Sequence, residues 1–151
     1  MLTTKTTGIK RVISHCKKTQ EGLKNMRPTY MKATVVVEQW IKRNIIAHGK
    51  NHDEGRYKWP PLSQNTIDYK RRHGAKTSNA DQPLRDTGNL MMRWDLSATN
   101  KKGIVKSGVR YSWRHEAGKG VPQRKIFPAK KQEGDIVKPV FEKYMEKITR
   151  W

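Results

Sequence analysis

Histidine and cysteine are the residue types in this chain that could hold a metal ion or act as a nucleophile. They are few and scattered: His15, Cys16, His48, His52, His73 and His115. A metal site draws three or four ligands from helices or hairpins at regular spacing, and this distribution does not predict such a set. His115 and Glu116 begin like the zinc-protease motif, but Lys119 stands where the second histidine is required. We therefore expect no metal site.

The remaining kinds of catalytic site have equally little support. Cys16 is the single cysteine, so it cannot form an internal disulfide. We interpret it as a small buried hydrophobe in a chain made in a reducing cytoplasm. The 13 carboxylates lack the paired spacing of metal-dependent hydrolases, and the loop GKGVP at 118–122 contains a proline, which has no amide hydrogen to offer a phosphate. We predict no catalytic residue, no cofactor and no enzymatic activity.

Basic side chains are the other chemically distinctive group. The chain has 33 Lys and Arg against 13 Asp and Glu, a formal net charge of +20, which can attract DNA, an anionic membrane or an acidic protein. Two basic clusters, at 69–72 and 110–114, include aromatic residues and could bind nucleic acid by phosphate contact and stacking. The alternative is a solvated basic face with its aromatic rings in the core. The candidate residues for contact with a partner or with DNA are Arg71, Arg72, Lys101, Lys102 and Lys119.

The composition predicts one domain with an incomplete core. The length of 151 residues suits a single domain over 1–151, with a helical hairpin at 1–48 and an α+β body at 49–151. Hydrophobic residues make up only 34%, which indicates that a partner completes part of the surface. No apolar run approaches the roughly 20 residues of a membrane span, so we expect no membrane partner.

The N-terminal third shows the spacing of two helices. Apolar residues recur at helical intervals over 9–26, and Pro28 separates this segment from a second one that ends near Gly49. The run from Val35 to Val37 offers a strand as the alternative, which the helical spacing of the flanking residues disfavours. We therefore expect a helical hairpin.

Short elements and loops follow. Ser63 can cap a short helix that ends at Gly74, and Asp86 or Thr87 can cap another that contains Leu90 and Trp94. We expect the loops 76–82 and 118–123 to be mobile in the free chain and ordered by neighbours. The predicted core of this region consists of Trp59, Leu62, Leu90 and Trp94.

In the last third of the chain, the spacing of apolar residues changes from helical to strand-like and then back to helical. Short apolar runs around 96–98 and 104–109 are split by the turn NKKG at 100–103, which predicts a β hairpin. A helical turn is expected over 111–117 and one more strand at 125–127. Helical spacing returns over 131–150, with Pro139 either at the start of this helix or at a kink within it.

Four short motifs between Trp59 and Phe127 resemble the virion morphogenesis family of tailed phages, the tail completion proteins of Mu-like and related phages. They are WPPLS at 59–63 with Thr66 and Lys70, PLRDTGNL at 83–90, a hairpin that leads to Tyr111 and HEAG at 115–118, and PQRKIF at 122–127. Together they cover roughly half of the chain. The sequence departs from the family at Met92 or Arg93, where a serine is usual, and at Glu116, where glutamine is frequent.

The resemblance implies a fold, a place of action and partners. The fold class would be α+β, with the N-terminal hairpin, a small antiparallel sheet of three or four strands and a C-terminal helix. The protein would be a tail terminator or neck protein at the head–tail junction, forming a ring of six copies. Its partners would be itself, the tail tube protein, the head connector and the genomic DNA in the channel. The alternative is a basic nucleic-acid-binding protein.

Overall fold

The computed structural model describes residues 7–52, 58–73 and 80–150. The elements are α1 (Thr7–Lys24), α2 (Arg27–Ile46), α3 (Gln64–Arg72), α4 (Asn89–Met92), β1 (Trp94–Ala98), β2 (Gly103–Ser107), α5 (Ser112–Ala117) and α6 (Lys130–Thr149). The predicted α+β class is confirmed, with helices at both ends and an antiparallel sheet between them. In this described part, no helix combines the length and apolar character that a membrane span requires.

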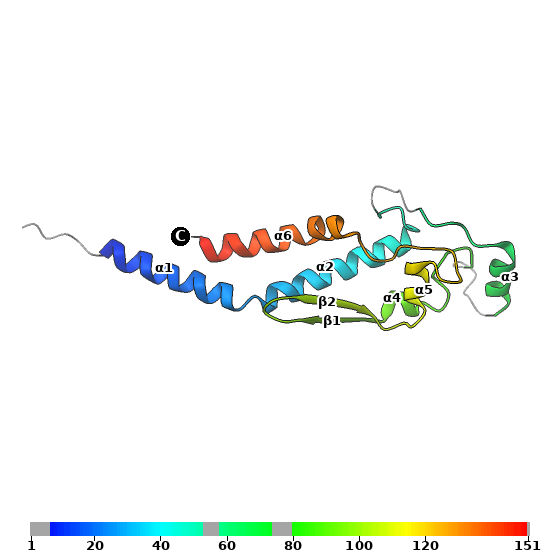
Figure 1. Cartoon of the computed structure of the whole chain (residues 1–151), viewed down its shortest axis with the longest axis horizontal. Helices are drawn as coiled ribbons and strands as arrows, with labels where there is room; N and C mark the ends of the chain where they lie inside the picture. Colours follow the sequence, from blue (N-terminus) through cyan, green and yellow to red (C-terminus); the bar gives the residue numbers. More distant parts are fainter. Residues whose placement is uncertain (1–6, 53–57, 74–79, 151) are drawn as a thin grey trace, which may run out of the picture.

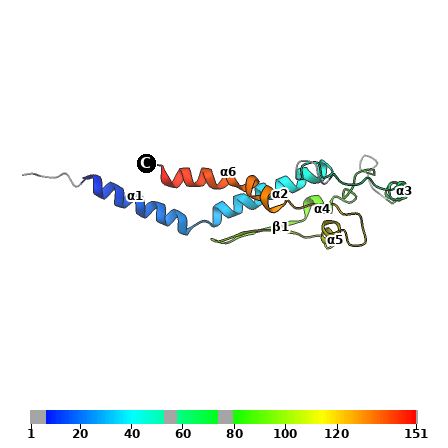
Figure 2. The same ribbon diagram turned by 45° about the horizontal axis from the view of Figure 1, so that its top comes forward.

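The helices give the molecule an elongated shape (Figure 1). The two N-terminal helices are present, but the hairpin is open: α1 runs away from α2 in both views (Figures 1 and 2). The C-terminal helix α6 lies beside α2 and continues beside α1. Two hydrogen bonds join α6 to α1, from Thr19 Oγ1 to the carbonyl of Ile148 at 2.9 Å and from Tyr144 Oη to the carbonyl of Gly22 at 2.7 Å.

The central helix α2 supplies most of the framework. Pro28 lies in its first turn, where its missing amide hydrogen costs no helical bond, and Val35 to Val37 are helical, so the strand alternative is wrong. Val37, Ile41 and Ile45 recur on the buried face. The helix ends before Gly49, whose positive φ of 80° lets its amide donate to the carbonyl of Asn44 at 2.9 Å.

The sheet is a single hairpin. Trp94 pairs with Ser107 and Ala98 with Gly103, so the turn predicted at 100–103 is confirmed within one residue. Gly103 is required by close approach to α2, because a Cβ there would lie 2.6 Å from Cγ2 of Thr34. Two predictions are corrected. The described residues form two strands instead of three or four, and Trp94 begins β1 instead of belonging to the preceding helix.

The core lies between the C-terminal half of α2, the hairpin and the loops. Its buried members are Val37, Trp40, Ile41, Ile45, Trp59, Leu90, Val109 and Ile126. Trp59 and Leu90 are therefore core residues as predicted, and Trp94 is partly buried against them. Leu62 directly precedes Ser63, the N-cap of α3, and is half-buried outside this cluster, so its predicted place in the core is wrong.

Most of the helix ends that were predicted from local residues are present in the structure. Ser63 caps α3 by accepting from the amide of Thr66, α5 ends at Gly118 with a φ of 70°, and α6 continues through Pro139. The start of α4 is set by Gly88 in the left-handed region, although Thr87 Oγ1 accepts from the amide of Asn89 at 3.4 Å. Cys16 is exposed on α1, which corrects its interpretation as a buried residue. Gly74 and residues 76–79 lie outside the described residues.

Candidate functional site

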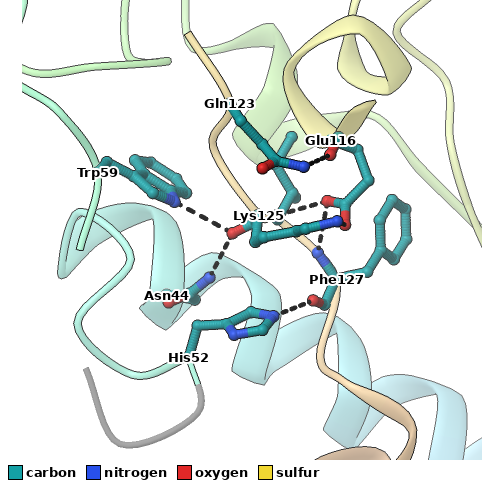
Figure 3. Close-up of polar contacts among 8 residues, drawn as sticks. Asn44, His52, Trp59, Glu116, Gln123, Lys125 and Phe127 are labelled. Carbon is teal, nitrogen blue, oxygen red and sulfur yellow. Dashed lines mark hydrogen bonds and ion pairs between the residues drawn. The ribbon is translucent and has the colours of Figure 1, made fainter. Parts of the chain in front are cut away.

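The residues with the densest polar contacts surround the segment 124–127 (Figure 3). The carbonyl of Lys125 accepts from Asn44 Nδ2 and from Trp59 Nε1, each at 3.1 Å. The carbonyl of Phe127 lies 3.0 Å from His52 Nε2, which must donate because a carbonyl only accepts. Side chains from α2 and from both sides of the following loop thus bind one stretch of backbone. We call this group of contacts the polar knot.

Glu116 completes the polar knot from α5. Its Oε2 accepts from the amides of Ile126 at 2.6 Å and Phe127 at 3.2 Å, and its Oε1 lies 3.6 Å from Lys125 Nζ. The side-chain Nε2 of Gln123 donates to the backbone carbonyl of Glu116 at 3.1 Å. The backbone groups that a strand would use are therefore satisfied by side chains. This is why the strand predicted at 125–127 does not form.

The buried Arg124 and the half-buried His115 extend the polar knot. The amide of Arg124 donates to the carbonyl of His115 at 2.8 Å, and Arg124 Nη2 donates to the carbonyl of Pro60 at 3.3 Å. Burial lowers the pKa of Arg124, which is only 4% exposed. Burial and the neighbouring Arg124 charge lower the pKa of His115, against a hydrogen bond with the backbone of Pro122 that raises it. The lowered pKa favours the neutral form of His115.

A second anchor joins α3 to the loop before α4. Lys70 is buried, and its Nζ donates to the carbonyls of Gln82 at 2.8 Å and Arg85 at 3.4 Å. Burial lowers the pKa of Lys70, while the nearby carboxylates of Asp86 and Asp81 raise it. The ammonium group of Lys70 thus binds two backbone carbonyls of one loop. It holds the loop at 82–85 against the end of α3.

These contacts bind side chains to backbone groups and thereby position loops. The side chains of Asn44, Trp59 and Lys70 all bind backbone carbonyls, and Glu116 binds backbone amides. Within residues 7–52, 58–73 and 80–150, no three His, Cys, Asp or Glu side chains gather closely enough to hold a metal ion. The arrangement therefore fixes the course of the loops around segment 124–127 and of the loop before α4.

The five candidate basic residues do not form one patch. Arg71 and Arg72 are exposed at the end of α3, where Arg71 lies 3.9 Å from Asp68. Lys101 and Lys102 are exposed on the hairpin turn, at the opposite end of the sheet from α3 (Figure 1). Lys119 follows α5, with its Nζ 5.7 Å from the centre of the Trp113 ring. A single partner would have to span the whole body to touch all five.

The sequence analysis missed several residues of the polar knot. Asn44 is completely buried on the apolar stripe of α2, between Ile41 and Ile45. A polar residue at such a position needs a hydrogen-bond partner, which is the signal that could have found it. His52 and Arg124 gave no such signal, because they lie in loops. Glu116 belonged to a motif, but its partners at 126 and 127 are fixed only by the fold.

Comparison with known proteins found no matching family model, no matching curated protein and no matching solved structure.

Proposed function

We propose that this chain is a structural protein of a tailed phage virion, which completes the tail tube and joins it to the head connector. The protein would act without bond chemistry. Copies would form a ring, six in number if the ring follows the symmetry of the tail. One face of the ring would stop growth of the tube, and the other would dock onto the connector.

One observation carries this proposal: the four motifs that resemble the tail completion family contact one another. Trp59 of the first motif donates to the backbone carbonyl of Lys125 in the fourth, and Arg124 of the fourth donates to the carbonyl of Pro60 in the first. Glu116 of the third binds the amide of Ile126 in the fourth. Leu90 of the second packs into the same core, and Lys70 binds its loop. Motifs that are short and distant in sequence thus form one structural unit.

The uncovered helices support a role in an assembly. Ile9, Val12 and Ile13 on α1 are 64%, 45% and 50% exposed, and the same stripe includes Leu23 at 47%. An amphipathic helix with its apolar stripe in water is normally covered by a neighbour. The net charge of +20 opposes close approach of identical copies. Assembly would therefore require the tube end or the connector, whose acidic surfaces offset the repulsion.

Binding of single-stranded nucleic acid is a second candidate function, favoured by the surroundings of Trp113. Its ring is 51% exposed, with the guanidinium of Arg114 at 5.9 Å and Lys119 Nζ at 5.7 Å from the ring centre. Bases stack on such rings while cations bind phosphates. This function predicts a steep fall of affinity with salt and a marked loss in Trp113→Ala, measured by anisotropy of a labelled oligonucleotide.

The test of the proposed function is loss of the gene in the phage that encodes the chain. Electron microscopy of the lysate should show DNA-filled heads and unattached tails, and supplying the chain from a plasmid should restore joined particles. Normal particle yield without the gene would contradict the proposal.

Charge-reversed variants in the same complementation assay test the candidate basic residues. Arg71→Glu with Arg72→Glu, or Lys101→Glu with Lys102→Glu, should reduce the joining of heads to tails while leaving the fold intact. Lys130→Glu with Lys131→Glu is the control, because it makes the same change in charge on exposed residues of α6. If both test pairs give the yield of this control, the basic residues form only a solvated surface.

A further inference from the structure

An apolar groove lies between the helices, on the side of α2 that faces away from the core. Its floor includes Met31, Val35 and Val36 of α2 and Val140 and Tyr144 of α6, and the end of α1 closes one side. The groove volume is about 1010 Å³. It is separate from the polar knot and contains none of the five candidate basic residues.

The composition of α2 indicates that this groove is covered in the working protein. Val37 and Ile41 are buried on the core side of the helix, but Val35 and Val36 on the groove side are equally apolar and only half-buried. Lys32 and Gln39 share this side of the helix and are exposed, so Val35 and Val36 form an apolar strip with a polar border. Apolar side chains that are left half-exposed along a groove of this size are typical of a surface that a partner covers.

The shape of the groove favours a helix as that occupant. The groove follows α2 from Pro28 to Val36 and α6 from Pro139 to Lys147, which is about 12 Å along each axis at the usual helical rise. The two helices lie side by side in both views (Figures 1 and 2). Two turns of a third helix could therefore lie between them and place an apolar stripe on the floor.

The charges on the rim determine the chemistry of the occupant. Lys32, Lys143 and Lys147 line the groove, opposed by one carboxylate, that of Glu21. A second copy of α1 would present an apolar stripe, but it would also add its own basic residues, Lys10, Arg11, Lys17 and Lys18, to this rim. Like charges across an interface repel, whereas acidic flanks would pair with the three lysines.

We propose that the groove binds an amphipathic helix of another protein, with an apolar stripe and acidic flanks. The inference depends only on the groove and its rim, so it holds or fails independently of the proposed virion function.

The experiment uses the full chain and three synthetic 15-residue peptides with a fluorescent label. The first has a leucine stripe at helical spacing and glutamate elsewhere, the second keeps the glutamates but has serine in the stripe, and the third keeps the leucines but has lysine elsewhere. Fluorescence anisotropy measures the affinity of each. The first peptide should bind at least tenfold more tightly than either of the others.

Two matched pairs of variants place the binding in the groove. Lys143→Glu with Lys147→Glu should weaken the first peptide at least tenfold, whereas Lys130→Glu with Lys131→Glu, an equal charge change elsewhere on α6, should weaken it less than threefold. Val36→Asp on the floor should act like the first pair. Its control is Ile46→Asp on the same helix, where the side chain is 52% exposed. Circular dichroism verifies that each variant is folded, and the lysine variants alter only exposed residues.

Several results would overturn the inference. Equal binding of the leucine and serine peptides would mean attraction by charge alone, as for nucleic acid. Tighter binding of the lysine peptide would favour a second copy of the chain. Equal weakening by the paired lysine variants would place the site elsewhere, and no binding of the first peptide would also reject the proposal.

Discussion

The body of the molecule and its helical arm differ in how they are held together. The body consists of the C-terminal half of α2 and the described residues between 59 and 127, which include the hairpin. Four of its apolar side chains are completely buried: Ile41, Ile45, Leu90 and Ile126. The arm consists of α1 and the second half of α6. In the described residues, these two helices are joined by two side-chain hydrogen bonds and by the close approach of Ile148 to Gly22. None of the residues of α6 is buried.

This difference indicates which part of the chain folds by its own contacts. In the body, apolar burial and the polar knot stabilise the same loops, so core and backbone hydrogen bonds depend on each other. In the arm, the exposed stripe of α1 and the groove beside α2 leave apolar surface in water. We expect the body to contribute more to the free energy of unfolding than the arm.

Leucine truncation should separate the two regions most strongly. Leu90→Ala removes a completely buried side chain and should lower the free energy of unfolding by about 2–5 kcal/mol. Leu23→Ala on α1 is the matched change in the arm, where 47% exposure predicts a loss of under about 1 kcal/mol. Urea denaturation followed by tryptophan fluorescence measures both. Similar losses would remove the distinction between body and arm.

Replacing a glutamate by glutamine should also lower the free energy of unfolding more in the body than in the arm, but by a smaller amount than leucine truncation. Glu116→Gln weakens two bonds to backbone amides and the ion pair with Lys125, so we expect a loss of about 1–3 kcal/mol. Glu142→Gln on α6 breaks only the exposed pair with Lys138 and should cost less than about 0.5 kcal/mol. If the two variants unfold at the same urea concentration, the polar knot does not stabilise the body.

Replacing a glycine by alanine should destabilise the protein in the hairpin and stabilise it in α6. Gly103→Ala forces a contact between the hairpin and Thr34, and should cost about 1–3 kcal/mol. A Cβ at Gly134 on α6 meets no atom within 4 Å, so Gly134→Ala should stabilise the helix by about 0.5–1 kcal/mol. Thermal melting by circular dichroism measures both shifts. A stabilising Gly103→Ala would mean that the hairpin does not sit closely on α2.

The smallest expected effect concerns pH and is confined to the body. The folded pKa of His115 is below its unfolded value of about 6.5, so the unfolded chain takes up the proton first as the pH falls. Its contribution to stability is therefore present above pH 6.5 and is lost as the pH decreases toward the folded pKa. His115→Gln should lose less stability than the unchanged chain between pH 7.5 and 5.5. Parallel stability curves for the variant and the unchanged chain would contradict the account.

The elements with strong local signals could be predicted from the sequence. Apolar spacing gave α1, α2 and α6, Ser63 and Gly118 marked helix ends, and the turn at 100–103 gave the hairpin. Each of these depends on residues within a few positions of one another. The α+β class followed because such elements succeed one another along the chain.

The parts that failed depend on distant contacts. The segment 125–127 has residues typical of a strand. Its conformation is instead determined by hydrogen bonds from Asn44, 81 residues from Lys125 in the sequence, and to Glu116 on α5. The direction of α1 depends on where α6 passes, which no spacing within 9–26 records. The candidate basic residues were chosen by type alone, so the sequence could not reveal that they lie on separate surfaces.

The most direct test of the central claim, that the chain is a structural component of the head–tail junction, is its location in purified virions. Electron cryomicroscopy of the neck, with mass spectrometry of the same particles, measures this. The account predicts that the chain is present in stoichiometric amounts and that density fitting its elongated body forms a ring between the head connector and the end of the tail tube. Absence of the chain from finished particles, or its location on the capsid or tail fibres, would contradict the account.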